Sequence, residues 1–196
     1  IGRPWVTLAV DIATRMVTGY HVSFEAPSRL SVALCLTQAV TPKAELLGDL
    51  ECAVPWPAQG KPRSIHVDNG RDFRSQAFQS ACAEWGINLV YRPPGSPHFG
   101  GHIERLIGTM MGAVHLLPGT TQSSVAAKGG YDSEANATMS LREFDRWLAL
   151  EICRYNNSIH SSLGCTPVAK WDTLAGEMSG DIPFDMEAFR VTFLPS

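Results

Sequence analysis

The sequence predicts an α/β domain in which a mixed β-sheet is flanked by helices. Short runs of β-branched and aromatic residues, separated by turn residues, predict strands. Longer stretches with apolar residues at helical spacing predict helices. Along the 196 residues the order is a hairpin, a helix, a strand, a helix, a strand, a loop and two further helices. This order is typical of helices that pack against a mixed sheet.

The first two strands are predicted to form a hairpin. Residues 5–10 and 16–24 are apolar and rich in β-formers, and the sequence DIATR separates them. Asp11 stands in this turn, where aspartate commonly makes local hydrogen bonds. We therefore expect an antiparallel pair with Asp11 at its turn.

A helix is predicted to begin at Ser28, a typical N-cap residue, and to end before Pro42. Residues 42–62 contain four prolines and little periodicity, so we expect a surface insertion there. The predicted inner face of the helix consists of Leu30, Ala33, Leu34, Thr37 and Val40.

The middle of the chain reads as strand, helix and strand. Residues 64–68 (SIHVD) form a short strand that ends at Asp68. A helical stripe then runs from Phe73 to Trp85 and stops at Gly86, a typical C-terminal cap. The sequence INLVYR, residues 87–92, predicts the next strand.

A loop rich in glycine and proline, residues 92–101, precedes the last part of the domain. Ser140 and Glu143 form a capping box, which predicts the start of another helix. A helix between this loop and Ser140 is predicted by apolar residues at helical spacing: Ile103, Leu106, Ile107, Met110 and Val114.

Composition limits the function classes. Apolar residues make up 44% of the chain and no apolar run reaches the ~20 residues of a membrane span, so a folded globular domain is expected. The net charge of −3 argues against a free-standing nucleic-acid-binding module, which is usually basic. Five cysteines without a Cys-x-x-Cys pair favour reduced thiols over a disulfide framework.

Two carboxylates are the candidates for chemistry. Asp68 ends a strand, where α/β sheets place their ligands, and Glu104 follows the glycine-rich loop at the start of a helix. Acidic pairs of this kind can hold Mg²⁺ for phosphodiester chemistry. Each residue also has a structural interpretation: Asp68 lies in the turn sequence DNG, and glutamate is favoured in the first turn of a helix. Together, with the loop between them, the pair is more specific.

These motifs resemble those of a known family. HVDNGRDF and PPGSPHFGGHIERLIGTM resemble the segments that carry the second Asp and the Glu of Asp-Asp-Glu transposases and retroviral integrases. VTLAVDIATRMVTGYHVSF and YNNSIHSSLGCTPVAKW resemble the integrase core more widely. The insertion that contains LPGTT and YDSE is similar to that of phage Mu-type transposases and their Tn7 and mercury-transposon relatives. The resemblance covers residues 2–175.

The resemblance implies a ribonuclease-H-like fold and a DNA transposase that cleaves and joins strands with two Mg²⁺ ions, Mn²⁺ being an alternative. Asp68 and Glu104 are then catalytic and metal-binding, and Arg92, His98 and Arg105 are candidates for DNA contact. The fold begins with three antiparallel strands, and the first catalytic Asp lies on strand one. Only two strands precede the helix at Ser28, so we expect that strand and its Asp to lie upstream of residue 1. The alternative, which the spacing of fifty-seven positions to Asp68 permits, is that Asp11 is the first catalytic Asp.

The resemblance further implies a domain organisation and partners. Residues 1–175 are expected to be the catalytic core, truncated at its N-terminus and inactive alone. Residues 176–196 are expected to be a connector that leaves the core toward a C-terminal domain. Transposon ends and target DNA are the expected partners of a cytoplasmic bacterial homo-oligomer without membrane contact. Two alternatives remain open: a degenerate ribonuclease-H-like scaffold that binds partners without catalysis, and a nuclease that cuts without joining.

Overall fold

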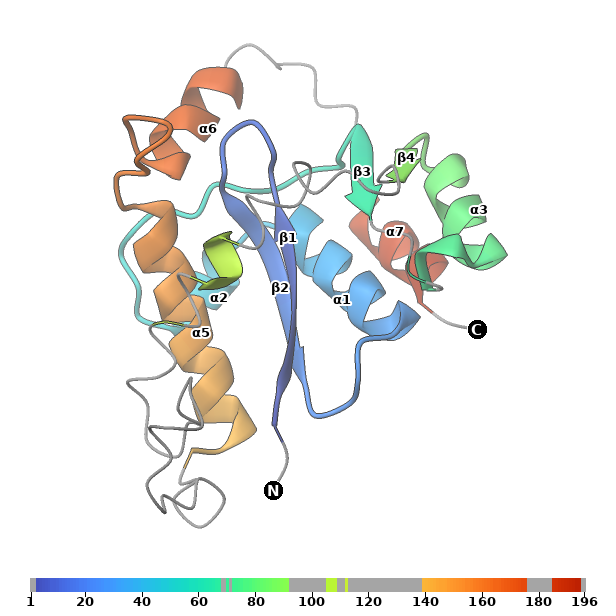
Figure 1. Cartoon of the computed structure of the whole chain (residues 1–196), viewed down its shortest axis with the longest axis horizontal. Helices are drawn as coiled ribbons and strands as arrows, with labels where there is room; N and C mark the ends of the chain where they lie inside the picture. The colour runs from blue at the N-terminus through green and yellow to red at the C-terminus, as the bar shows by residue number, and fades with distance from the viewer. Residues whose placement is uncertain are drawn as a thin grey trace.

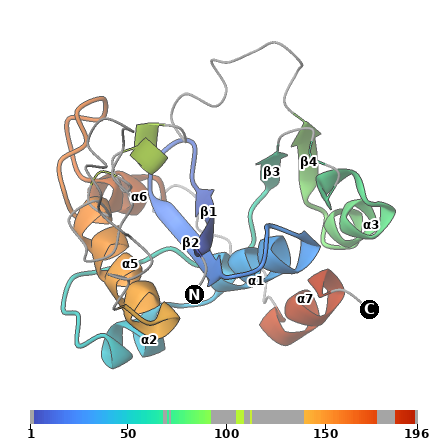
Figure 2. The ribbon, with the colours of Figure 1, turned by 60° about the horizontal axis from the view of Figure 1, so that its bottom comes forward.

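The computed structural model describes residues 3–67, 70, 72–91, 105–108, 112, 139–175 and 185–194. A β-hairpin lies between α1 on one side and α5 on the other, while a second strand pair lies beyond α1 with α3 and α7 (Figures 1 and 2). Two hydrophobic cores result from this arrangement, one on each side of α1.

The predicted hairpin is confirmed. Strands β1 (Trp5–Val10) and β2 (Val17–Ser23) pair antiparallel, with Trp5 opposite Ser23 and a bulge between Ala9 and Val10. The strands are joined by the turn that contains Asp11.

Helix α1 (Arg29–Val40) packs closely on β2. It begins with a capping box in which the Ser31 hydroxyl accepts a hydrogen bond from the Ser28 amide at 2.9 Å, and it ends before Pro42 as predicted. Gly19 on β2 permits the close approach, because a Cβ placed there would lie 2.6 Å from the amide nitrogen of Ala39. Because α1 packs on the hairpin and also forms part of the second core, its buried residues lie on more than the single predicted face.

The prediction that residues 42–62 are a surface insertion is wrong. The segment contains helix α2 (Ala44–Asp49) and buries Lys43, Trp56 and Ala58. The Trp56 indole N–H donates to the Val17 carbonyl at 2.8 Å, so the ring is buried with its polar atom bonded. The burial of Trp56, with its hydrogen bond to Val17, makes this proline-rich segment part of the first core.

The second strand pair is parallel. Strands β3 (Ser64–Val67) and β4 (Asn88–Tyr91) pair in register, with Val67 opposite Tyr91. A 3₁₀ turn (Asp72–Arg74) and helix α3 (Gln76–Glu84) connect them, and Gly86 follows α3 with a φ of 61°, as expected for a helix cap.

The strands of the described residues do not form the single mixed sheet predicted from the sequence. They form two separate two-stranded sheets, β1–β2 and β3–β4. In each pair, only one edge of each strand is hydrogen-bonded to another described strand. No hydrogen-bonded ladder joins β1 to β3. The two sheets together contain both antiparallel and parallel pairing, as predicted.

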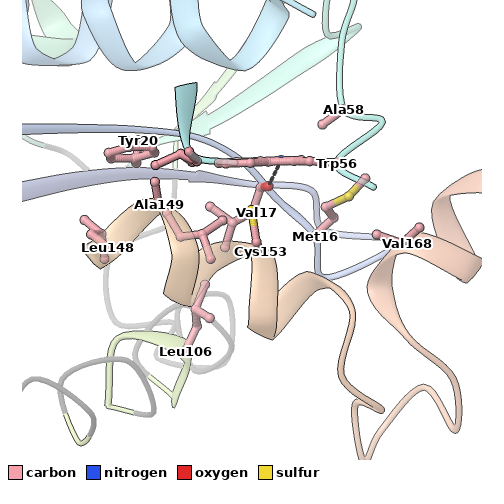
Figure 3. Close-up of a cluster of buried hydrophobic side chains, with 12 residues drawn as sticks. Met16, Val17, Tyr20, Trp56, Ala58, Leu106, Leu148, Ala149, Cys153 and Val168 are labelled. Carbon is pink, nitrogen blue, oxygen red and sulfur yellow. Dashed lines mark hydrogen bonds between the residues drawn. The ribbon is translucent and has the colours of Figure 1, made fainter. Parts of the chain in front are cut away.

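Helix α5 (Leu141–Asn156) covers the other face of the hairpin, and α6 (Pro167–Ala175) follows it. The predicted capping box of Ser140 and Glu143 is present at the start of α5. At its end the Asn156 side chain accepts from the Val17 amide at 2.9 Å and donates to the Val17 carbonyl at 3.0 Å. The first core, shown in Figure 3, contains Met16, Val17, Tyr20, Leu50, Trp56, Ala58, Leu106, Leu148, Ala149, Ile152, Cys153 and Val168.

Helix α7 (Met186–Phe193) packs on α1 and α3 and completes the second core. Phe189 and Phe193 are 0% and 3% exposed. The expectation that this segment leaves the core is therefore not met by residues 185–194, because two aromatic side chains at helical spacing hold them to the domain. That residues 176–196 connect to a further domain stays a prediction.

No helix within the described ranges is long and apolar enough to cross a membrane. All five cysteines are free thiols.

Candidate functional site

The carboxyl ends of β3 and β4 lie side by side. The pairing is parallel and Val67 lies opposite Tyr91, so the two strands end at the same edge of the sheet. This is the edge at which α/β sheets place their ligands. In the sequence, Asp68 and Arg92 directly follow Val67 and Tyr91. Asp68 and Arg92 themselves lie outside the described residues.

Tyr91, the last residue of β4, contacts Phe73, Arg74 and Gln79, which lie between β3 and β4 in the sequence. Its hydroxyl donates to the Phe73 carbonyl at 2.7 Å and accepts from the Gln79 side chain at 3.1 Å. The Arg74 guanidinium lies 5.7 Å from the centroid of the Tyr91 ring, a cation–π distance. These contacts fix Phe73 and Arg74 against the end of β4. Neither Tyr91 nor Arg74 was among the candidate residues predicted from the sequence. The tyrosine at the end of the predicted strand 87–92 was the available signal for this contact.

The second candidate carboxylate, Glu104, lies outside the described residues, as does His98. Residues 105–108, which directly follow Glu104 in the sequence, are helical, in agreement with the predicted helix. Leu106 is 4% exposed and enters the first core near Leu148 and Cys153 (Figure 3). Arg105, a predicted DNA contact, is exposed. The start of this helix is therefore anchored by packing two positions beyond Glu104.

The Asp11 carboxylate is hydrogen-bonded within its own turn. One carboxylate oxygen accepts hydrogen bonds from the backbone amide and the hydroxyl of Thr14, each at 2.7 Å. The Asp11 amide donates to the Met16 carbonyl at 2.8 Å, and Arg15 adopts a left-handed φ of 64° to close the turn. Thr14 is 2% exposed, so the contact is held inside the protein. The local hydrogen bonding predicted for Asp11 is confirmed.

A further acidic side chain lies between the hairpin and α5. Asp145 hydrogen-bonds the Tyr20 hydroxyl, and burial raises the pKa of Asp145 while that hydrogen bond opposes the rise. Burial also raises the pKa of Tyr20 well above its ordinary value. Both residues belong to the packing between β2 and α5, and neither is at the strand ends.

The described residues contain no group of three or more His, Cys, Asp or Glu side chains that could hold a metal ion. That Asp68 and Glu104, whose carboxylate oxygens suit Mg²⁺, hold a metal ion stays a prediction.

The chain is similar to bacterial transposases over most of its length. It is 29% identical over 179 residues to the transposase for transposon Tn552 of Staphylococcus aureus, covering 88% of this chain and 33% of that protein. It is 24% identical over 212 residues to the transposon Tn7 transposition protein TnsB of Escherichia coli, covering 100% of this chain and 30% of that protein. The chain thus spans about a third of the length of these relatives.

Solved structures share the fold. The catalytic core domain of BIV integrase aligns with a TM-score of 0.53 and 18% identity, over 89% of this chain and 90% of that one. A chain of the simian T-cell lymphotropic virus intasome in complex with PP2A regulatory subunit B56 gamma aligns with a TM-score of 0.55 and 18% identity, over 92% of this chain and 51% of that one. The likeness shows the ribonuclease-H-like α/β fold of integrase catalytic cores.

Fold and similarity together define an integrase-core domain of the transposase class, which confirms the resemblance found in the motifs. The model of the TnsB C-terminal domain family matches residues 1–119. The chain belongs to that family.

Proposed function

We propose that this domain is the catalytic core of a DNA transposase that cleaves DNA and transfers strands with the help of divalent metal ions. The observation that carries the proposal is the parallel β3–β4 pair, whose strands end together at Val67 and Tyr91, the residues that precede Asp68 and Arg92 in the sequence. Membership of the TnsB C-terminal domain family and similarity to two transposases support the same function.

In this proposal Asp68 and Glu104 hold Mg²⁺, or Mn²⁺ in its place, with two ions in the complete protein. Such ions activate an attacking oxygen and stabilise the leaving one in phosphodiester chemistry. Tyr91 holds Phe73 and Arg74 close to the end of β4, and Leu106, two positions after Glu104 in the sequence, packs in the first core. Water is the first nucleophile, and a 3′-hydroxyl is the second.

We further propose that Arg92, His98 and Arg105 contact DNA. Cationic side chains near a scissile phosphate bind its backbone without reading sequence. The exposure of Arg105 on a helix whose next residue is buried agrees with this role. Transposon ends and target DNA are the proposed partners, and the full-length protein is proposed to act as a homo-oligomer in the bacterial cytoplasm.

The first catalytic aspartate is proposed to lie on a strand that inserts between β1 and β3. Three observations support it. No ladder joins the two sheets, α1 packs on both, and the Asp11 carboxylate is taken by Thr14. A chain without that strand is proposed to be inactive.

The test is a strand-transfer assay of the full-length protein with three variants. Asp68→Asn and Glu104→Gln should abolish strand transfer, because an amide is a poorer Mg²⁺ ligand than a carboxylate. Asp11→Asn, the control at a carboxylate held by its turn, should retain most activity. If folded Asp11→Asn protein is as inactive as the other two, then Asp11 is a metal ligand and the assignment of the inserted strand is wrong.

A further inference from the structure

An exposed arginine lies beside the ends of β3 and β4. Arg74 is the last residue of the 3₁₀ turn between β3 and α3, and its side chain is exposed. Its guanidinium carbon lies 5.7 Å from the centroid of the Tyr91 ring. Tyr91 is the last residue of β4 and lies opposite Val67, the last residue of β3. The charge of Arg74 is therefore placed at the edge of the sheet where both strands end.

Hydrogen bonds hold the backbone at this arginine. The Gln79 side-chain amide donates to the Arg74 carbonyl at 3.2 Å and to the Tyr91 hydroxyl at 3.1 Å. The Tyr91 hydroxyl donates in turn to the Phe73 carbonyl at 2.7 Å. Ser75, the next residue, is the N-cap of α3. The turn is thus joined to β4 and to α3, so the Arg74 side chain starts from a fixed position.

The Tyr91 ring holds the other end of the side chain. An exposed arginine loses rotamer freedom when it binds a ligand, and this loss weakens binding. Stacking on an aromatic face orders the guanidinium beforehand and leaves its planar fork of N–H groups able to bind an anion. Five N–H donors allow the group to keep a partner within the protein and still bind a phosphate. Arg74 on Tyr91 is therefore a preorganised cation.

Charge and position indicate which ligand this cation fits. A guanidinium binds phosphate oxygens through two parallel hydrogen bonds. The chain as a whole has a net charge of −3, so its affinity for DNA depends on where its cations are placed rather than on an excess of them. The proposed function places DNA at the edge where β3 and β4 end, which is also where Arg74 lies.

We propose that Arg74, held by Tyr91, binds a phosphate of the DNA backbone next to the proposed catalytic site. The inference rests on the proposed function, because it requires DNA at this edge of the sheet. It adds to Arg92, His98 and Arg105 a contact that is built from described side chains. Because the contact is to the backbone, it strengthens binding to every DNA sequence equally.

The test is the affinity of the full-length protein for a short DNA duplex, measured by fluorescence anisotropy without divalent metal ions so that the DNA is not cut. One phosphate contact contributes about −0.9 to the slope of log K against log salt concentration. Arg74→Gln should therefore make that slope shallower by about 0.9, and at about 0.1 M salt it should weaken binding about eightfold. Two duplexes of unrelated sequence should show the same loss.

Two further variants separate this contact from a general loss of charge. Arg154→Gln removes an exposed cation that pairs with Glu151 on α5, across the hairpin from α3 (Figure 1), and should leave slope and affinity unchanged. Tyr91→Leu keeps the charge of Arg74 but removes the ring that holds it. It should weaken binding about two- to tenfold with an unchanged slope, because the arginine must then be ordered on binding. Circular dichroism of each variant establishes that it is folded.

Four results would overturn the proposal. They are a salt dependence in Arg74→Gln equal to that of the parent protein, an equal loss in Arg154→Gln, parent affinity in Tyr91→Leu, and a loss that differs strongly between the two sequences, as a contact to bases would give.

Strand transfer by Asp68→Asn distinguishes a failure of this inference from a failure of the proposed function. If Asp68→Asn is inactive and Arg74→Gln binds DNA like the parent protein, only the Arg74 contact is wrong. If the parent protein binds neither duplex, the proposed function is wrong and the Arg74 contact with it.

Discussion

Replacing Gly19 with alanine tests the closest contact in the fold. The added Cβ would lie 2.6 Å, 2.7 Å and 2.8 Å from the amide nitrogen, Cα and Cβ of Ala39. Two of these atoms belong to the backbone of α1, so the helix must shift as a unit to relieve the clash. Gly48 in α2 provides the matched control, because a Cβ there would meet nothing within 4 Å.

The expected magnitude follows from two opposing terms. Overpacking a tight site costs about 1–3 kcal/mol. Alanine restricts the unfolded chain more than glycine does, which offsets about 0.4–1 kcal/mol. Gly19→Ala should therefore lower the free energy of unfolding by about 1–2 kcal/mol. Gly48→Ala should raise it by about 0.5–1 kcal/mol, because glycine is unfavourable inside a helix.

The assay is urea unfolding followed by tryptophan fluorescence, with thermal melts as a second measurement. For a chain of this size, 1 kcal/mol corresponds to about 2–4 °C in Tm. We expect Gly19→Ala to melt roughly 2–8 °C lower than the parent and Gly48→Ala to melt slightly higher. A Gly19→Ala protein as stable as the parent, or a shift of equal size and sign in both variants, would refute the close packing of α1 on β2.

Three further changes test other parts of the fold. Asn156→Ala should cost about 1–3 kcal/mol, because the buried Val17 amide loses its acceptor; urea unfolding measures this, and a loss below 0.5 kcal/mol would contradict the contact. Phe189→Ala should cost about 3–5 kcal/mol, whereas exposed Val191→Ala should stay within about 0.5 kcal/mol; equal effects would mean that α7 is not docked. Burial lowers the pKa of Lys43 to about 7. The unfolded chain then binds more protons at this site between about pH 7 and pH 10, so stability should rise with pH over that window, and Lys43→Met should remove that part of the rise in denaturation curves. An unchanged pH profile in Lys43→Met would contradict the shift.

Local patterns in the sequence determined where most elements begin and end. The hairpin turn at Asp11, the caps at Ser28 and Ser140, and the stop at Gly86 each depend on contacts between residues a few positions apart. Such contacts form in whatever tertiary context the segment has, so the pattern alone predicts them. The motifs that mark the transposase class were readable for a similar reason, since each is a contiguous stretch of the sequence.

Tertiary structure decided what the proline-rich segment and the C-terminal residues do. Trp56 is buried through a hydrogen bond to Val17, 39 positions away in the sequence. Phe189 is buried against helices that are formed by the first half of the chain. The helical spacing of Phe189 and Phe193 marks a helix but not the helices on which it packs, and Trp56 has no local signal for its partner. Each contact exists only after the chain has folded back on itself. Tertiary structure also decides that the strands form two separate pairs. The residues of a strand predict the strand itself, but they do not specify which neighbour will bond to its second edge.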